Sequence, residues 1–184
     1  MGDSHETDSE REQRFDDLYR AYFARVLAYA LRRAPQEVAH DVVADTFLVA
    51  WRRLERLPEE PLPWLLAVAR KTLANTRRGH SRRNLLLGKL EARELTRHSQ
   101  LSSSDPALEL GEITVALGKL SDPDRELLQL IAWEGLTVVE AARALGQSAA
   151  TCRVRLHRAR RRLARELGGE TTPEPFITIP KEQL

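Results

Sequence analysis

Arginine dominates the last third of the chain, with seven guanidinium groups between residues 153 and 165 and no acidic residue until Glu166. They are Arg153, Arg155, Arg158, Arg160, Arg161, Arg162 and Arg165. A guanidinium presents planar donors that match phosphate oxygens and the major-groove edge of guanine. The segment therefore predicts contact with nucleic acid. The alternative is an arginine-rich helix that is merely solvated.

A second basic segment, residues 70–83, contains no acidic residue. Its candidate contact residues are Arg70, Lys71, Asn75, Arg77, Arg78, Arg82 and Arg83. Apolar residues precede it at helical spacing, so one face is expected to pack and the other to meet nucleic acid. Trp64 belongs to the apolar face and is expected to pack rather than to stack on an unpaired base. Taken alone, this pattern also fits a membrane surface or an acidic partner.

The composition narrows the class of protein. Net charge is only +2 over 184 residues, because the first seventeen residues are acidic and offset the two basic segments. The single cysteine, Cys152, excludes an internal disulfide and a cysteine-built zinc site. The longest uncharged apolar run, residues 61–69, is too short to span a bilayer, and the N-terminus lacks a secretion signal. A cytoplasmic protein without membrane insertion is expected.

Helical spacing recurs along the chain and period-2 alternation is nearly absent, which predicts an all-α fold. A first helix is expected through Phe15 to Ala30 and a second from Val38 to Leu54. A third should begin near Pro63, since proline suits a first helical turn. The clustered serines 102–104 and Asp105-Pro106 mark a linker between two helical blocks.

A helix-turn-helix is predicted at residues 137–167. Thr137 and Glu140 have capping-box spacing, Gly146 ends the first helix, and Ser148 is the expected N-cap of the second. The N-terminal part of such a second helix reads bases, and later arginines contact phosphate. Cys152 lies on the apolar stripe and is expected to be a small core residue; a redox switch is the alternative. The DNA-contacting set is Ser148, Ala149, Thr151, Arg153, Arg155, Arg158, Arg161 and Arg162.

Two series of motifs resemble the extracytoplasmic-function sigma factors of bacterial RNA polymerase. The first comprises F-x-x-L-Y-x-x-Y from Phe15, D-V-V-A-D-T-F-L-V-A-W from Asp41, and P-W-L-L-A-V-A-R from Pro63. The second comprises L-S-D-P-D-R-E-L-L-Q-L from Leu120, E-G-L-T-V-V-E-A-A-R-A-L-G from Glu134, and T-C-R-V-R-L-H-R-A-R-R-R-L from Thr151. They are similar to conserved regions 2 and 4, in that order.

The resemblance implies two small helical domains and assigns them boundaries. Residues 1–14 become an acidic tail, 15–83 region 2, 84–106 an extended linker, 107–167 region 4, and 168–184 a C-terminal tail. Region 2 would dock on the clamp helices of the largest polymerase subunits and capture the −10 promoter motif. Region 4 would read the −35 motif and approach the polymerase flap. An anti-sigma factor is the implied regulator, and neither cofactor, metal nor catalytic residue is implied.

The resemblance also assigns individual residues. It implies that the residues in contact with polymerase are Asp41, Asp45, Thr46, Phe47, Trp51 and Arg52. It implies that the −10 motif is bound by the basic segment, including Arg82 and Arg83, together with Arg56 in the preceding loop. The sequence departs from the family pattern at Ala44, where glutamine is frequent, and at Ala141, Ala150 and Cys152. The −35 sequence is therefore not readable from the recognition helix.

Geometry also favours a two-site promoter reader. Motifs about 20 base pairs apart are separated by roughly 65–70 Å, and a linker of about 23 residues extends to about 75 Å. The main rival is a stand-alone helix-turn-helix regulator, which leaves the basic 70–83 segment unexplained. An enzyme is the second rival, but His40 and Asp41 point to different sides of a helix and do not form a metal site with Asp45.

Overall fold

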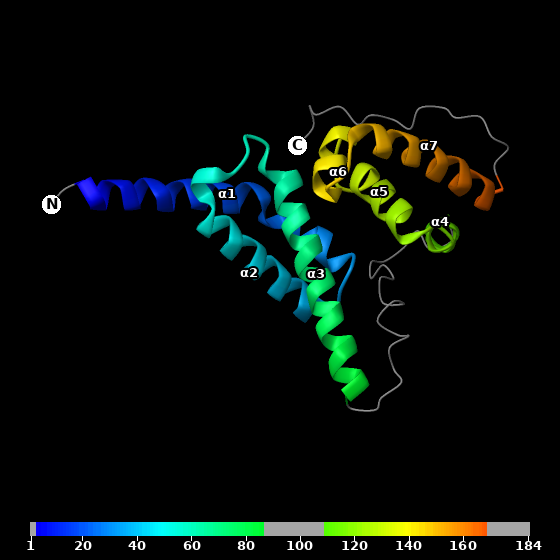
Figure 1. Ribbon diagram of the computed structural model, residues 1–184, viewed down its shortest axis with the longest axis horizontal. Helices are drawn as coiled ribbons and strands as arrows, with labels where there is room; N and C mark the ends of the chain where they lie inside the picture. The colour runs from blue at the N-terminus through cyan, green and yellow to red at the C-terminus, as the bar shows by residue number, and fades with distance from the viewer. Residues whose placement is uncertain (1–2, 87–108, 169–184) are drawn as a thin grey trace.

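The computed structural model describes residues 3–86 and 109–168, and all regular elements in these ranges are helical. The all-α prediction is confirmed. The elements are α1 (Asp3–Leu31), α2 (Gln36–Arg52), a 3-10 turn η1 (Leu54–Arg56), α3 (Pro61–Leu86), α4 (Glu109–Gly118), α5 (Asp122–Ala132), α6 (Val138–Leu145) and α7 (Ala149–Glu166). Helices α1–α3 form one half of the molecule and α4–α7 the other (Figure 1).

The first half is a three-helix bundle. Its buried residues lie singly or in adjacent pairs that are three or four positions apart along each helix: Val26, Tyr29 and Ala30 on α1; Val42, Val43, Phe47 and Ala50 on α2; Leu65, Leu66, Ala69 and Leu73 on α3. Helix α3 begins at Pro61, two residues earlier than predicted, with Pro63 also in its first turn. Both prolines are tolerated because the first-turn N–H groups have no helical partner.

The second half contains the predicted helix-turn-helix. Thr137 and Glu140 form a reciprocal capping box at the start of α6. Gly146 ends α6 in the left-handed conformation, with φ at +65°, which favours a residue without a Cβ. Ser148 caps α7 by accepting from the Thr151 backbone N–H at 3.0 Å. The three turn signals in the sequence are confirmed.

The acidic N-terminus differs from the prediction, because residues 3–14 continue helix α1 instead of forming a tail. Arg11 anchors this extension: its Nη2 donates to the Trp51 carbonyl oxygen at 3.2 Å, and its guanidinium carbon lies 4.6 Å from the Trp51 ring centroid. Acidic residues near a helix N-terminus also complement the helix dipole. Hydrophobic periodicity alone missed this stretch because its stabilising groups are charged.

The two halves pack against each other. Helix α6 lies against α3, and residues near the C-terminal end of α1 contact α5 and the turn that follows it (Figure 1). A single cluster of buried apolar residues runs through both halves. The sequence predicted two domains but carried no signal for this direct contact. Residues 87–106 of the predicted linker lie outside the part of the chain that the structure describes.

Candidate nucleic-acid and polymerase interfaces

The recognition helix α7 is held by a buried apolar stripe. Cys152, Leu156 and Ala159 face inward at steps of four and three residues, and Leu163 continues the stripe half-buried. They pack among the buried residues Leu136, Ala141 and Ala142 and the half-buried Leu145. This is the arrangement predicted for the helix-turn-helix, and it fixes which side of α7 faces solvent.

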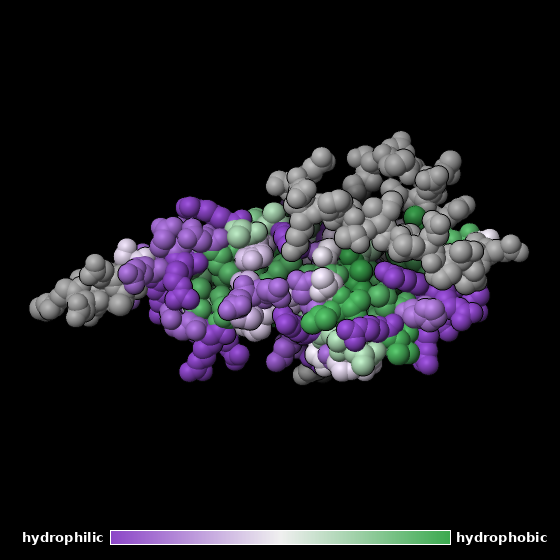
Figure 2. Space-filling view, turned by 90° about the horizontal axis from the view of Figure 1, so that it is seen from above, coloured by the Kyte–Doolittle hydropathy of each residue, from purple (hydrophilic) through white to green (hydrophobic). Residues whose placement is uncertain are grey.

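Most predicted −35 contacts lie on that solvent side. Ser148, Thr151, Arg153, Arg158, Arg161 and Arg162 are exposed, and Ala149 is half-buried. The Ser148 and Thr151 hydroxyls are hydrogen-bonded to each other at 2.8 Å, so the cap itself orients two polar groups at the tip of the helix. On the face seen in Figure 2, hydrophilic residues lie toward both ends of the molecule, the one that α1 forms and the one where α7 lies, with hydrophobic residues between them.

Arg155 is the exception, and its assignment to base reading is corrected. Its side chain is 23% exposed, its Nε donates to Asp124 Oδ1 at 3.2 Å, and its Nη1 donates to Gln147 Oε1 at 3.1 Å. Two acceptors therefore direct this guanidinium back toward α5 and the turn. The reason is helical phase: position 155 lies beside the buried positions 152, 156 and 159.

Gln147 and Asp124 are structural residues of this site that the sequence analysis missed. Gln147 Oε1 accepts from Arg155 and also from the Cys152 thiol, whose Sγ lies 3.6 Å away. Cys152 itself is fully buried, which confirms its core assignment, and burial raises the pKa of its thiol despite the opposing charge of Arg155. No sequence signal marked Gln147, because its partner becomes adjacent only when α7 docks.

The basic face of α3 is largely as predicted. Arg70, Lys71, Asn75, Arg77 and Arg78 are exposed, as is Arg56 in η1. Arg78 Nη2 donates to Asn75 Oδ1 at 2.5 Å, whereas Arg77 Nη2 donates to the Arg33 carbonyl oxygen at 2.8 Å.

The remaining predicted residues of this segment are Arg82, Arg83 and Trp64. The backbone of Arg82 and Arg83 continues α3, and their side chains lie outside the part of the chain that the structure describes. Trp64 is half-buried and packs on the hydrophobic core, as expected for the apolar face.

The predicted polymerase-binding set divides into two groups. Asp41, Asp45 and Arg52 are exposed on α2, but Thr46 is 0% and Phe47 3% exposed. The direct partner contact expected of Thr46 and Phe47 is corrected: both pack inward, and Thr46 Oγ1 donates to the Val42 carbonyl oxygen at 2.6 Å. The outward face instead offers Leu48, which is 46% exposed and was not predicted.

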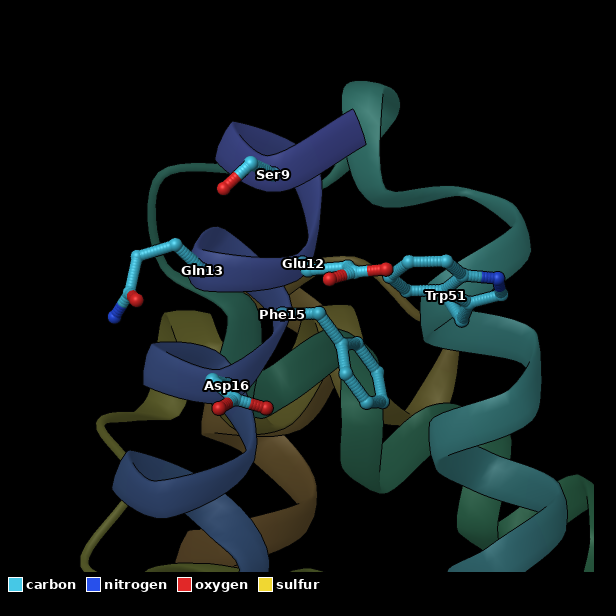
Figure 3. Close-up of a pocket in the computed structure, with 6 residues that line it drawn as sticks. All are labelled: Ser9, Glu12, Gln13, Phe15, Asp16 and Trp51. Carbon is cyan, nitrogen blue, oxygen red and sulfur yellow. The ribbon is translucent and has the colours of Figure 1, made fainter. Parts of the chain in front are cut away.

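A shallow hollow of about 440 Å³ adjoins the end of α2. Figure 3 shows Trp51 from α2 and Phe15 from α1 on one side and the Glu12 carboxylate lying toward Trp51. The Phe15 and Trp51 rings meet edge to face, with centroids 5.1 Å apart. Trp51 is half-buried, so it both packs in the bundle and lines this surface.

Across residues 3–86 and 109–168, no group of three or more His, Cys, Asp or Glu side chains is arranged to hold a metal ion. No helix within these ranges is long and apolar enough to cross a membrane.

Comparison with known proteins identifies both halves. Residues 18–83 match the family described as Sigma-70 region 2, and residues 110–163 match Sigma-70, region 4. The chain is 32% identical to the RNA polymerase sigma factor NccH of Alcaligenes xylosoxydans xylosoxydans over 151 residues, which cover 76% of this chain and 79% of NccH. It is also 32% identical over 158 residues to the ECF RNA polymerase sigma factor SigL of Mycobacterium tuberculosis strain H37Rv, covering 82% and 89% of the two chains.

Solved structures agree with these relatives. The sigma factor RpoE, crystallised with the anti-sigma factor NepR from Bartonella quintana, aligns with a TM-score of 0.63 at 25% identity, covering 84% of this chain and 96% of RpoE. CnrH in complex with the cytosolic domain of CnrY aligns with a TM-score of 0.54 at 30% identity, covering 84% and 87%. The chain therefore belongs to the extracytoplasmic-function RNA polymerase sigma factors of the sigma-70 family.

Proposed function

We propose a division of labour among three exposed surfaces of this sigma factor. The outward face of α2, with Asp41, Asp45 and Arg52, binds core RNA polymerase. The basic face of α3 captures the −10 motif, and the outward face of α7 reads the −35 motif. The observation that carries the proposal is the presence of two separate basic faces, one in each half, each backed by buried apolar residues.

The division fits the charges of the described residues. Exposed acids on α2 suit a basic partner surface, and they lie on a different helix from the arginines of α3 and α7. Phosphate contacts alone give weak, salt-dependent binding for each small half. Joining both halves through polymerase raises the effective concentration of each for one promoter. Two motifs read together thereby supply the specificity that neither half provides alone.

We also propose an anti-sigma factor as the regulatory partner, because the similar RpoE was crystallised with the anti-sigma factor NepR. A cytoplasmic location is part of this proposal, because a protein that acts with RNA polymerase is located where transcription takes place. The chain supplies recognition and the polymerase supplies the chemistry, so no catalytic step is assigned to any residue here.

The test is reconstituted transcription with core RNA polymerase and this chain on a library of genomic promoter fragments. The proposal is supported if transcription start sites appear only when the chain is added and if their promoters share two motifs about 20 base pairs apart. The control is a double variant of exposed residues outside the three surfaces, Asp17→Asn with Arg20→Gln on α1. Specific duplex binding without polymerase, combined with no stimulation of transcription, would instead identify a stand-alone regulator.

A further inference from the structure

One large apolar side chain lies on the solvent side of the recognition helix. Val154 is 51% exposed and follows directly after Arg153 in the N-terminal half of α7. Apart from Ala150, it is the only apolar residue among the exposed positions of α7, whose residues 149–166 are all described. The other exposed positions carry threonine, histidine, arginine or glutamate. Val154 is therefore an isolated apolar group in a cationic surface.

Val154 lies at the centre of that surface. Successive residues of an α-helix are about 100° apart, so Val154 is about 200° around the axis from the fully buried Cys152. Arg153 lies to one side of it and Arg158 to the other. A helix in the major groove presents the centre of its outward face to the base edges, while its flanks approach the phosphates. The position of Val154 is therefore one that meets bases.

The fold of the protein gives no reason for a valine at position 154. Among the described residues, Val154 belongs neither to the buried core nor to the half-buried apolar residues packed against it. Valine also has a lower helix propensity than alanine or arginine, because its branched Cβ loses side-chain freedom in a helix. Either of those residues would stabilise α7 at least as well. The valine thus fits a contact with a ligand rather than a contact within the chain.

The chemistry of the major groove limits what an exposed valine can recognise. The base pairs present hydrogen-bond donors and acceptors there, and the apolar substituent among them is the C5-methyl group of thymine. A valine that covers a donor or acceptor removes its water without replacing the hydrogen bond, which is unfavourable. Burial of the thymine methyl against the valine methyls is favourable, because apolar surface is removed from water. A valine at this position therefore favours thymine over the other three bases.

We propose that Val154 is a specificity-determining residue that recognises the methyl group of one thymine in the upstream promoter element. The inference rests on the proposed −35 role of α7. It adds an apolar contact to the hydrogen bonds expected of Arg153, so that adjacent positions of the helix favour different bases. The guanidinium of Arg153 matches guanine, and the methyl groups of Val154 match thymine.

The test uses the promoter fragment that gives the strongest chain-dependent transcription in the reconstituted assay above. Each thymine of its upstream element, on either strand, is replaced in turn by deoxyuridine, which lacks only the C5-methyl group and keeps the base pairing. Competition binding to holoenzyme, assembled from core RNA polymerase and the full chain, measures the affinity of each fragment. The wild type is compared with Val154→Ala and with Val154→Thr, which keeps one of the two methyl groups.

Val115→Ala is the matched control, because it makes the same change at a valine of α4 that is 62% exposed and lies outside the three proposed surfaces. Val154→Ala is expected to fold as the wild type does, since the side chain is exposed and alanine has the higher helix propensity. Circular dichroism verifies the helical content of every variant.

Deoxyuridine at one position is expected to weaken binding of the wild type and of the control about three- to fivefold, as for the loss of one buried methyl group. Val154→Ala should bind the thymine and uracil fragments equally at that position. Val154→Thr should retain part of the difference. These three results together support the inference.

Other results overturn it. Equal binding of thymine and uracil fragments by the wild type at every position shows that no methyl group is recognised. An undiminished methyl effect in Val154→Ala shows that another residue recognises it. If Val154→Ala weakens binding of all fragments by the same factor and keeps the methyl effect, Val154 contacts a protein surface instead. If no base change in the upstream element alters wild-type binding, the −35 role of α7 fails, and the inference fails with it.

Discussion

Arg155 of α7 and Asp124 of α5 form an ion pair in which 3.2 Å separate Nε from Oδ1. The pair attaches the recognition helix to the helix behind it, and Ser121 supports it by donating its hydroxyl to Asp124 Oδ2 at 2.7 Å. Arg153, two positions away, is exposed and forms no such ion pair with any residue in the described ranges. Neighbouring arginines on one helix therefore serve different purposes.

Arg155→Ala is expected to lower the free energy of unfolding by about 1–3 kcal/mol, because it leaves a partly buried carboxylate without its charged donor. Urea denaturation followed by circular dichroism provides the measurement. Arg153→Ala is the matched control, expected within about 0.5 kcal/mol of wild type. Equal destabilisation by both substitutions would contradict the distinction.

Arg153→Ala is expected to relax preference at the upstream promoter element, at a cost of about 1–3 kcal/mol if the contact is bidentate. Arg162→Ala, further along α7, should weaken binding to all sequences alike, since phosphate contacts carry no sequence information. Competition binding with single-base variants of a −35 duplex in the presence of polymerase distinguishes the two. Identical base profiles for both variants would show that the division between reading and anchoring is wrong.

Asp45→Ala is expected to weaken binding to core polymerase while leaving stability unchanged, because the side chain is exposed on the outward face of α2. Thr46→Ala should do the reverse, lowering the free energy of unfolding by about 1–2 kcal/mol through lost packing and a lost hydrogen bond. Surface plasmon resonance against core polymerase and urea denaturation separate the effects. A binding defect in a stable Thr46→Ala protein would contradict its buried placement.

Thr137→Ala is expected to cost about 0.5–2 kcal/mol, because it removes the side-chain acceptor for the Glu140 backbone N–H at the start of α6. Thr137→Ser retains the hydroxyl and is the control. Thermal denaturation of both variants provides the comparison. If serine and alanine destabilise equally, the lost group is the methyl rather than the cap.

Burial raises the pKa of the Cys152 thiol, which has a consequence for stability. Because the folded pKa is above the unfolded one, this contribution is fully present below the ordinary thiol pKa of about 8.5 and is lost as pH rises through the folded pKa. The free energy of unfolding should therefore decrease as the pH rises above about 8.5, and this decrease should be less steep in Cys152→Ala. Burial also raises the pKa of Tyr29, so that residue contributes a similar decline at higher pH in both proteins.

Thiol reactivity provides an independent check on Cys152. The native protein is expected to react with a disulfide reagent near neutral pH much more slowly than the urea-unfolded chain, since the thiol is fully buried and its ionisation is disfavoured. Rapid modification of the folded protein would instead favour the redox alternative.

Apart from residues 3–14 of α1, the sequence by itself determined the helices, their turn chemistry and the two basic faces. Thr137, Gly146 and Ser148 act through backbone groups within three or four residues, so short spacings were sufficient to predict them. The apolar stripe through Cys152 and Leu156 likewise fixed which side of α7 is buried, because helical period converts spacing into direction.

Tertiary structure decided what depends on distant residues. Arg155 meets an aspartate 31 positions away, Arg33 meets a glutamate 93 positions away, and the acid-rich start of α1 is held by Arg11 against Trp51. Charged side chains on a helix surface have no periodic signature that identifies their partner, and only the packing of one helix on another selects it. Thr46 and Phe47 are a different case: each follows a buried valine, Val42 or Val43, by four residues, so helical spacing indicates burial, and only the family resemblance placed them at the polymerase surface.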